Sequence, residues 1–124
     1  LSQLTDSAIE SMCTEWLRSR FANETYRICY QIIRTGGNFA DIDILGSNSE
    51  GKIIAAQISN TNNKKLINNK IDALNHFQSD HKIMFSMSNE AKINGCVNIC
   101  IADIWRDFES DKLYQTMLER LARL

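Results

Sequence analysis

Residues 36–59 constrain the fold of this chain more than any other segment, because they read as two β-strands joined by a short loop. Side chains alternate faces along a strand, so Asp41 and Asp43 project from the face opposite Ile42 and Ile44. Two acids on one face repel each other, and their burial is unfavourable without a cation or hydrogen-bond donors. The pattern therefore predicts a compensating partner, and a divalent cation is the simplest candidate.

The loop at residues 46–51, bounded by glycine at both ends, is expected to fold the second strand back on the first. Gln57 and Ser59 share one face of that second strand by the same alternation. The hairpin then brings Asp43 and Gln57 together at one end of the pair. A carboxylate and a carboxamide that meet in this way outline a metal site.

Length and composition predict a single domain spanning residues 1–124. The chain has 124 residues and 44% hydrophobic content, which is enough for one hydrophobic core. It contains no proline and no apolar run of about 20 residues, so we expect neither a linker nor a membrane-spanning segment. The chain begins with Leu and ends with LERLARL, from which we expect a fragment of a longer polypeptide whose other domains are its partners.

Charge and cysteine content indicate which kinds of partner and which cellular compartment suit this chain. The balance of 14 basic and 15 acidic residues is far from that of a self-sufficient nucleic-acid binder. Any contact with a polyanion must therefore be local or come from another domain. The four cysteines do not form a CxxC pair or a secreted disulfide framework, so we expect reduced core thiols in a cytoplasmic protein, at Cys13, Cys29, Cys96 and Cys100.

A zinc site is disfavoured by spacing. It would combine His76 and His81 with Cys96 and Cys100. On one strand the two cysteines would lie about 13 Å apart, at about 3.3 Å per residue, which is too far for one ion.

Hydrophobic periodicity predicts the order helix, three strands, helix, two strands, helix. Ser7 and Glu10 have the spacing of a capping box at the start of the first helix. The fold class is α/β, with a central mixed sheet flanked by helices. Helices are expected at residues 6–21, at 62–79 and around Trp105 to Leu121, and strands at 26–33, 40–45, 52–59, 82–86 and 97–101.

In their order and spacing these features resemble the PD-(D/E)XK nuclease superfamily, especially its Mrr-like and restriction-endonuclease-like branches. The likeness covers residues 9–105 and is carried by three short motifs, IESMC with Glu10, ADIDI with Asp43 and AAQIS with Gln57. It implies a restriction-endonuclease-like fold. It also implies that Asp43 is the metal-binding Asp, that Gln57 fills the Glu or Gln position, and that Glu10 is the supporting acid on the first helix.

One position departs from the pattern. The family usually carries its catalytic Lys two residues after the Glu or Gln, where this chain has Ser59. Serine supplies no positive charge, so the departure bears on catalysis and not on the fold. Some members recruit the Lys from a neighbouring element, and Lys64, Lys65 and Lys70 follow here. Lys70 is the preferred substitute because it lies next to the apolar stripe of its helix, and Lys64 is second.

The resemblance implies a Mg²⁺-dependent endonuclease that hydrolyses DNA phosphodiester bonds in a restriction or defence system, with Mn²⁺ as a substitute ion. Mg²⁺ takes oxygen ligands and keeps several waters, so few protein ligands suffice. Those expected are Asp43, Gln57, the carbonyl of Ile58 and Glu10. A nearby Lys would orient the attacking water and offset charge in the transition state.

Each assignment has a structural alternative. Asp41 is the end of a hairpin or the cap of a turn on this interpretation, and Glu10 is the capping-box acid of its helix. Gln57 satisfies buried backbone groups, and Ser59 starts the turn into the next helix.

Two alternatives also exist for the function. The missing motif Lys and the neutral Gln57 suit a degenerate nuclease fold that serves nucleic-acid binding or protein assembly. An amphipathic C-terminal helix at residues 111–124 suits self-association into a homo-oligomer.

Overall fold

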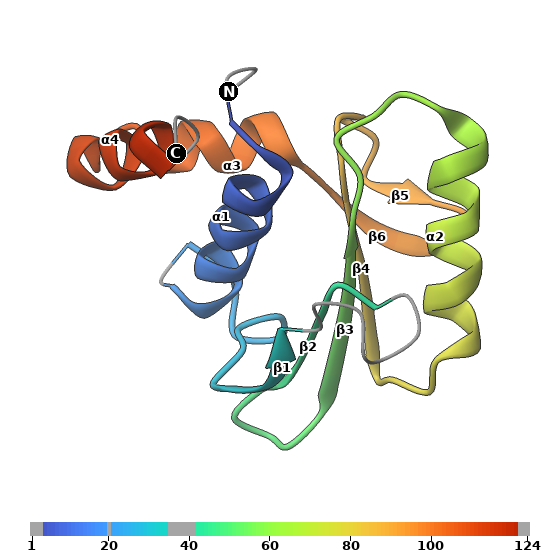
Figure 1. Cartoon of the computed structure of the whole chain (residues 1–124). Coiled ribbons are helices and arrows are strands. Elements are labelled where there is room, and N and C mark those ends of the chain that lie inside the picture. Colours follow the sequence, from blue (N-terminus) through green and yellow to red (C-terminus); the bar gives the residue numbers. More distant parts are fainter. Residues whose placement is uncertain (1–3, 20, 35–41, 122–124) are drawn as a thin grey trace.

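The computed structural model describes residues 4–19, 21–34 and 42–121 of the chain (Figure 1). A mixed six-stranded sheet is flanked by helices, which confirms the predicted α/β class. The elements, in chain order, are α1 (Asp6–Arg18), β1 (Tyr30–Arg34), β2 (Ile44–Ser47), β3 (Ile53–Ile58), α2 (Lys64–His76), β4 (His81–Ser86), β5 (Lys92–Ile93), β6 (Cys96–Cys100), α3 (Ile101–Asp107) and α4 (Lys112–Leu121).

The strand order in the sheet is β1-β2-β3-β4-β6-β5. The first three strands form an antiparallel meander, β3, β4 and β6 run parallel, and β5 is antiparallel to β6. Parallel neighbours need a crossover connection, and α2 makes the one between β3 and β4. In the antiparallel pair, the start of β2 therefore lies beside the end of β3, where α2 is about to begin.

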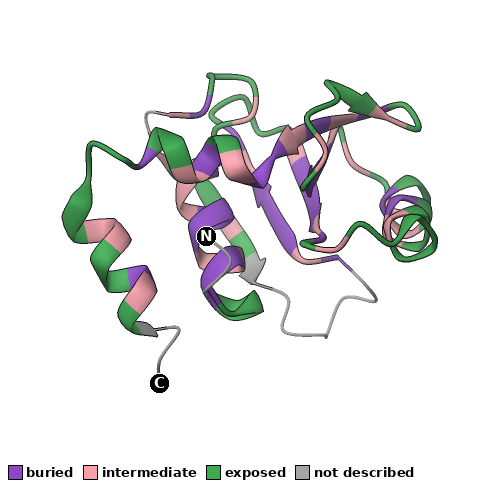
Figure 2. Ribbon diagram, turned by 90° about the horizontal axis from the view of Figure 1, so that it is seen from above, coloured by how far each residue is buried: buried purple, intermediate pink, exposed green. Residues whose placement is uncertain are grey.

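The two faces of the sheet are covered unequally (Figures 1 and 2). Helix α1 packs on one face, and α3 and α4 join the same apolar cluster. Helix α2 packs on the other face through Ile71 and Leu74, which belong to one cluster with Leu45, Ala55 and Met84. Strand alternation produces this division, since Ile44, Ile54 and Ala56 belong to the α1 cluster.

Helix α1 begins at Asp6, as predicted, but its cap is not the one expected. Thr5 is the N-cap, and its hydroxyl accepts a hydrogen bond from the backbone N–H of Ala8 at 3.1 Å. The capping box of Ser7 and Glu10 is therefore wrong, because Ser7 already lies within the first turn. The helix ends at Arg18, earlier than the predicted residue 21, because the Ser19 hydroxyl donates to the carbonyl of Trp16.

The first strand begins later than predicted. Tyr26 lies in a turn closed by its N–H on the carbonyl of Asn23, and β1 starts only at Tyr30. The aromatic and β-branched composition of this segment serves packing instead, since the Tyr26 ring meets the His81 ring edge-on at 5.6 Å. All four cysteines are free thiols, but Cys29 is exposed, so only three of the four predicted core thiols lie in the core.

The C-terminal part contains one more strand and one more helix than predicted. The extra strand, β5, pairs with β6 through a tight turn in which Asn94 and Gly95 have φ of 48° and 83°. The predicted final helix is divided, because the backbone N–H of Asp111 bonds to the carbonyl of Phe108 between α3 and α4. Over the described ranges, no helix is both long enough and apolar enough to cross a bilayer.

Gly46 in β2 is expected to be sensitive to substitution. A Cβ atom there would lie 2.7 Å from Cγ2 of Ile28 and 2.9 Å from the carbonyl oxygen of Tyr30. Gly46→Ala should lower the free energy of unfolding by about 1–3 kcal/mol, measured by urea denaturation. Gly51→Asn is the control, since Gly51 has φ of +76° with open space around it, and Asn tolerates that conformation. Equal stability of the two variants would contradict the close packing at Gly46.

Candidate functional site

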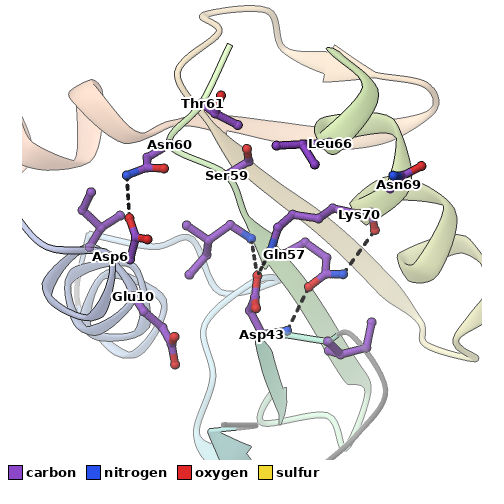
Figure 3. Close-up of a pocket in the computed structure, with 13 residues that line it drawn as sticks. Asp6, Glu10, Asp43, Gln57, Ser59, Asn60, Thr61, Leu66, Asn69 and Lys70 are labelled. Atoms are coloured by element: carbon purple, nitrogen blue, oxygen red, sulfur yellow. Dashed lines mark hydrogen bonds and ion pairs between the residues drawn. The ribbon is translucent and has the colours of Figure 1, made fainter. Parts of the chain in front are cut away.

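A cleft of about 770 Å³ opens between α1, the start of β2, the end of β3 and the first half of α2 (Figure 3). Its walls come from segments far apart in the sequence but adjacent in the sheet topology. The cleft is lined by Asp6, Ile9, Glu10, Ile42, Asp43, Gln57, Ile58, Ser59, Asn60, Thr61, Leu66, Asn69 and Lys70.

Asp43 lies at the floor of the cleft, just before β2. Its Oδ2 accepts hydrogen bonds from the backbone N–H of Ile58 at 2.8 Å and from Lys70 Nζ at 3.0 Å. Both side chains are partly exposed, at 27% for Asp43 and 37% for Lys70. The carboxylate is thus fixed by strand β3 on one side and neutralised by helix α2 on the other, while staying open to the cleft.

Gln57 has a different environment from Asp43. It is fully buried, and its carboxamide is engaged at both ends. Its Oε1 accepts from the backbone N–H of Asp43 at 2.9 Å, and its Nε2 donates to the carbonyl of Lys70 at 3.2 Å. Asp43 and Gln57 do converge as the hairpin predicts. With these two hydrogen bonds Gln57 satisfies buried backbone groups, which is the structural alternative predicted for it. A role as metal ligand stays a prediction.

Lys70 reaches the site because of its place on α2. Ile71 and Leu74 are buried against the sheet, and Lys70 lies at the edge of that apolar stripe. Its side chain extends from the helix across the end of β3 to Asp43 (Figure 3). Lys70 therefore lies beside the Asp43 carboxylate, where the substitute Lys is expected. It comes from α2, whereas the motif position, Ser59, follows β3.

Glu10 projects from α1 on the opposite wall of the cleft. It is five residues past the Thr5 cap, so the alternative role of capping-box acid does not apply. Burial and the charges of Glu10 and Asp43 raise the pKa of the Cys13 thiol.

Ser59 follows the last residue of β3, at the position where the family pattern has Lys. It is 4% exposed, and its backbone N–H donates to the carbonyl of Phe85. Its hydroxyl is buried and has no hydrogen-bond partner in the described part of the chain. The side chain lines the cleft.

The other expected site residues lie as follows. The N–H of Ile58 binds Asp43, and its side chain packs against the α1 cluster. Lys64 is the first residue of α2 and is exposed, and it does not line the cleft. Ile42 belongs to the apolar cluster on the α2 side, not to the opposite face with Ile44, because β2 begins only at residue 44. Asp41 lies outside the described residues.

One link across the cleft was not expected from the sequence. Asn60, just after β3, donates from Nδ2 to the Asp6 carboxylate at the start of α1, at 2.7 Å. The two residues are 54 positions apart, and no periodicity connects them. Only the general richness in amides after β3 marks this segment as unusual.

The side chains available as metal ligands determine which ion the cleft suits best. Over residues 4–19, 21–34 and 42–121, no three His, Cys, Asp or Glu side chains gather around one point. Three carboxylates, those of Asp6, Glu10 and Asp43, line the cleft, and both hydrogen bonds described for the Asp43 side chain go to Oδ2. A small set of hard oxygen donors suits Mg²⁺, which keeps most of its waters, better than a softer ion such as zinc.

Comparisons of this chain with protein-family models, with curated proteins and with solved structures give no match. The candidate site is therefore defined by its own geometry.

Gln57→Glu tests the buried bridge between Asp43 and Lys70. The new carboxylate cannot donate to the Lys70 carbonyl, so the free energy of unfolding at pH 7 should fall by about 2–3 kcal/mol. Burial and the nearby Asp43 carboxylate should raise the pKa of the introduced carboxyl group in the folded state above its unfolded value of about 4.3. The folded variant then binds more protons, so its stability relative to wild type should fall as pH rises through that range. Urea denaturation between pH 4 and pH 7 measures this, and a pH-independent difference would contradict the bridge.

Proposed function

We propose that this chain is a metal-dependent nuclease domain of restriction-endonuclease-like fold that hydrolyses DNA phosphodiester bonds. The supporting observation is the pair formed by Lys70 Nζ and Asp43 Oδ2, 3.0 Å apart at the end of the hairpin. An acid that can hold a cation and an ammonium group beside it, both in one open cleft, suit metal-assisted phosphodiester hydrolysis.

The topology supports the same proposal. A helix bearing an inward acid precedes the three-stranded meander, and a crossover helix follows the strand that carries Gln57. This is the element order on which the resemblance to the PD-(D/E)XK superfamily rests. The departure at Ser59 is offset by Lys70, which brings an ammonium group to the same carboxylate from α2.

The residues that would hold Mg²⁺, or Mn²⁺ in its place, are Asp43 and Glu10, with the carbonyl of Ile58 as a further oxygen donor. A bound divalent cation would supply Lewis-acid stabilisation of charge on the phosphoryl oxygens. Asp43 is suited to this role because its orientation is set by the Ile58 N–H, which leaves the remaining carboxylate oxygen directed to the cleft.

Lys70 is assigned the role of the motif Lys. Its ammonium group orients the attacking water and offsets negative charge that develops in the transition state. Gln57 acts as a positioning residue, because it joins the backbone of Asp43 to the backbone of Lys70 and so sets the distance between the two functional side chains.

A second candidate function is a non-catalytic module of the same fold that binds nucleic acid or assembles with other proteins. It is favoured by the engagement of both ends of the Gln57 carboxamide with backbone groups. This candidate requires no cleavage with any divalent ion and no rise in melting temperature when Mg²⁺ or Mn²⁺ is added. A clear rise with Mn²⁺ would argue against it.

The proposed function extends to the cellular location of the domain and the system in which it acts. We assign the domain to a cytoplasmic restriction or defence system, with target recognition by other domains of the same polypeptide. Self-association through α4 is a further candidate property, because Leu113 is 86% exposed and Met117 47% exposed on that helix. Sedimentation that shows a monomer at high concentration would exclude it.

Cleavage of supercoiled plasmid DNA in Mg²⁺ or Mn²⁺ tests the proposal. Asp43→Asn and Lys70→Met should each lower the rate by about 10²-fold or more, because each removes a charge that acts on the transition state. Both variants should stay folded, since a partly exposed ion pair contributes only about 0–1 kcal/mol.

Lys52→Met is the matched control for Lys70→Met. Lys52 is an exposed lysine in the loop between β2 and β3, outside the cleft lining, so its loss should leave cleavage unchanged. Undiminished cleavage by Asp43→Asn would refute the site assignment. Absence of cleavage by wild type with every divalent ion would refute the nuclease function.

A further inference from the structure

The start of α2 carries charges that do not suit a helix start. Its first two residues are Lys64 and Lys65, both exposed, and its first turn contains no acid. The N-terminal end of a helix has partial positive charge, so acids stabilise it and cations destabilise it. No acid occurs anywhere in residues 59–71. This end of the helix therefore favours an anion that the described chain does not provide.

Ser59 supplies an independent sign of a ligand at the same place. The residue is only 4% exposed, and its hydroxyl has no partner over the described residues. Figure 3 shows this hydroxyl pointing toward Thr61 and Leu66 at the cleft mouth, on the far side of Lys70 from Asp43. An unpaired buried hydroxyl is unfavourable, and an incoming acceptor oxygen would relieve it.

An exposed side chain lines the same cleft as the Ser59 hydroxyl. Leu66 lies beside Ser59 at the cleft mouth and is 49% exposed. Exposed side chains change rotamer readily, so Leu66 can move within the cleft without any change in the backbone.

The opposite wall of the cleft directs an anion toward α2. Asp6 and Glu10 line that wall on α1, and the Asp6 carboxylate binds the amide of Asn60 at 2.7 Å. These acids repel phosphate. A polyanion can therefore approach the Asp43–Lys70 pair most favourably along the side formed by the end of β3 and the first turn of α2.

The type of anion follows from which donors are available. The Asn63 side chain already accepts from the N–H groups of Lys65 and Leu66. The Thr61 hydroxyl accepts from the N–H of Asn63. The donors that remain for an anion are therefore the ammonium groups of Lys64 and Lys65 and the hydroxyl of Ser59, not a cradle of backbone N–H groups. Such donors suit the exposed phosphates of a nucleic-acid backbone, which lysines contact without base specificity.

We propose that the first turn of α2, through Lys64, Lys65 and the hydroxyl of Ser59 below it, binds a backbone phosphate of nucleic acid. This phosphate is adjacent to the one that reaches the Asp43–Lys70 pair. The inference rests on the proposed function in taking the ligand to be a nucleic acid, and it assigns Lys64 to substrate binding instead of catalysis.

Binding of a fluorescein-labelled DNA duplex of about 20 base pairs tests the subsite, by fluorescence anisotropy in EDTA at roughly 50 to 200 mM salt. Lys64→Gln/Lys65→Gln should weaken binding about tenfold at low salt and lower the slope of log K against log salt by about 0.9, the value for one phosphate contact. Its melting temperature should be unchanged or higher, because two cations leave the positive end of α2.

Lys52→Gln/Lys112→Gln is the matched control. It removes the same charge from two exposed sites outside the cleft, and Lys112 is also the first residue of a helix. The control should bind as wild type does. Equal weakening of both double variants would overturn the subsite, since only net charge would then matter.

Ser59→Ala isolates the hydroxyl. It should weaken binding about threefold to tenfold with an unchanged salt slope, because no charge is lost. Its melting temperature should be equal to or above that of wild type, since an unpaired buried group is removed. A lower melting temperature with unchanged binding would assign the hydroxyl to stability and overturn its place in the subsite.

The same measurements separate this inference from the proposed function. Lysine-dependent binding by a wild type that never cleaves DNA would support the subsite and refute the nuclease. Cleavage by a wild type whose binding is unaffected by Lys64→Gln/Lys65→Gln would do the reverse. Absence of DNA binding by wild type would overturn the subsite.

Discussion

The buried carboxamide of Gln57 is the contact on which the arrangement of the cleft depends. It accepts from the backbone of Asp43 and donates to the backbone of Lys70, so one side chain joins the entry to β2, the end of β3 and the middle of α2. A fully buried amide has no water to replace these bonds, so losing either is unfavourable. The distance between the Asp43 carboxylate and the Lys70 ammonium follows from this neutral bridge.

The cleft itself follows from the unequal covering of the sheet. Helix α1 lies on one face and α2 on the other, and both approach the end of β3 where the sheet stops (Figure 1). Side chains from both faces can therefore reach the same open space beyond Ile58. Glu10 comes from one side and Lys70 from the other, while Asp43 lies between them at the start of β2. A strand end between two helices brings opposite charges together without burying either.

Sequence patterns predict the parts of this site that depend on periodicity. The expected hairpin places Asp43 near Gln57, and the helical stripe of Ile71 and Leu74 places Lys70 beside the sheet. Periodicity does not predict what a side chain will bind. The cap at Thr5 and the two backbone partners of Gln57 depend on exact spatial neighbours, and so does the break between α3 and α4.

The net charge of −1 does not exclude contact with a polyanion, because charge in this chain is segregated around the cleft. The wall on α1 carries acids, and residues 59–71 carry three lysines and no acid. Over the Debye length of about 8–10 Å at physiological salt, a phosphate near α2 senses the local lysines more than the chain as a whole. Overall composition predicts only that binding will be weak without further domains. The local distribution determines the side from which a nucleic acid would approach, and that side is the one where Lys70 reaches Asp43.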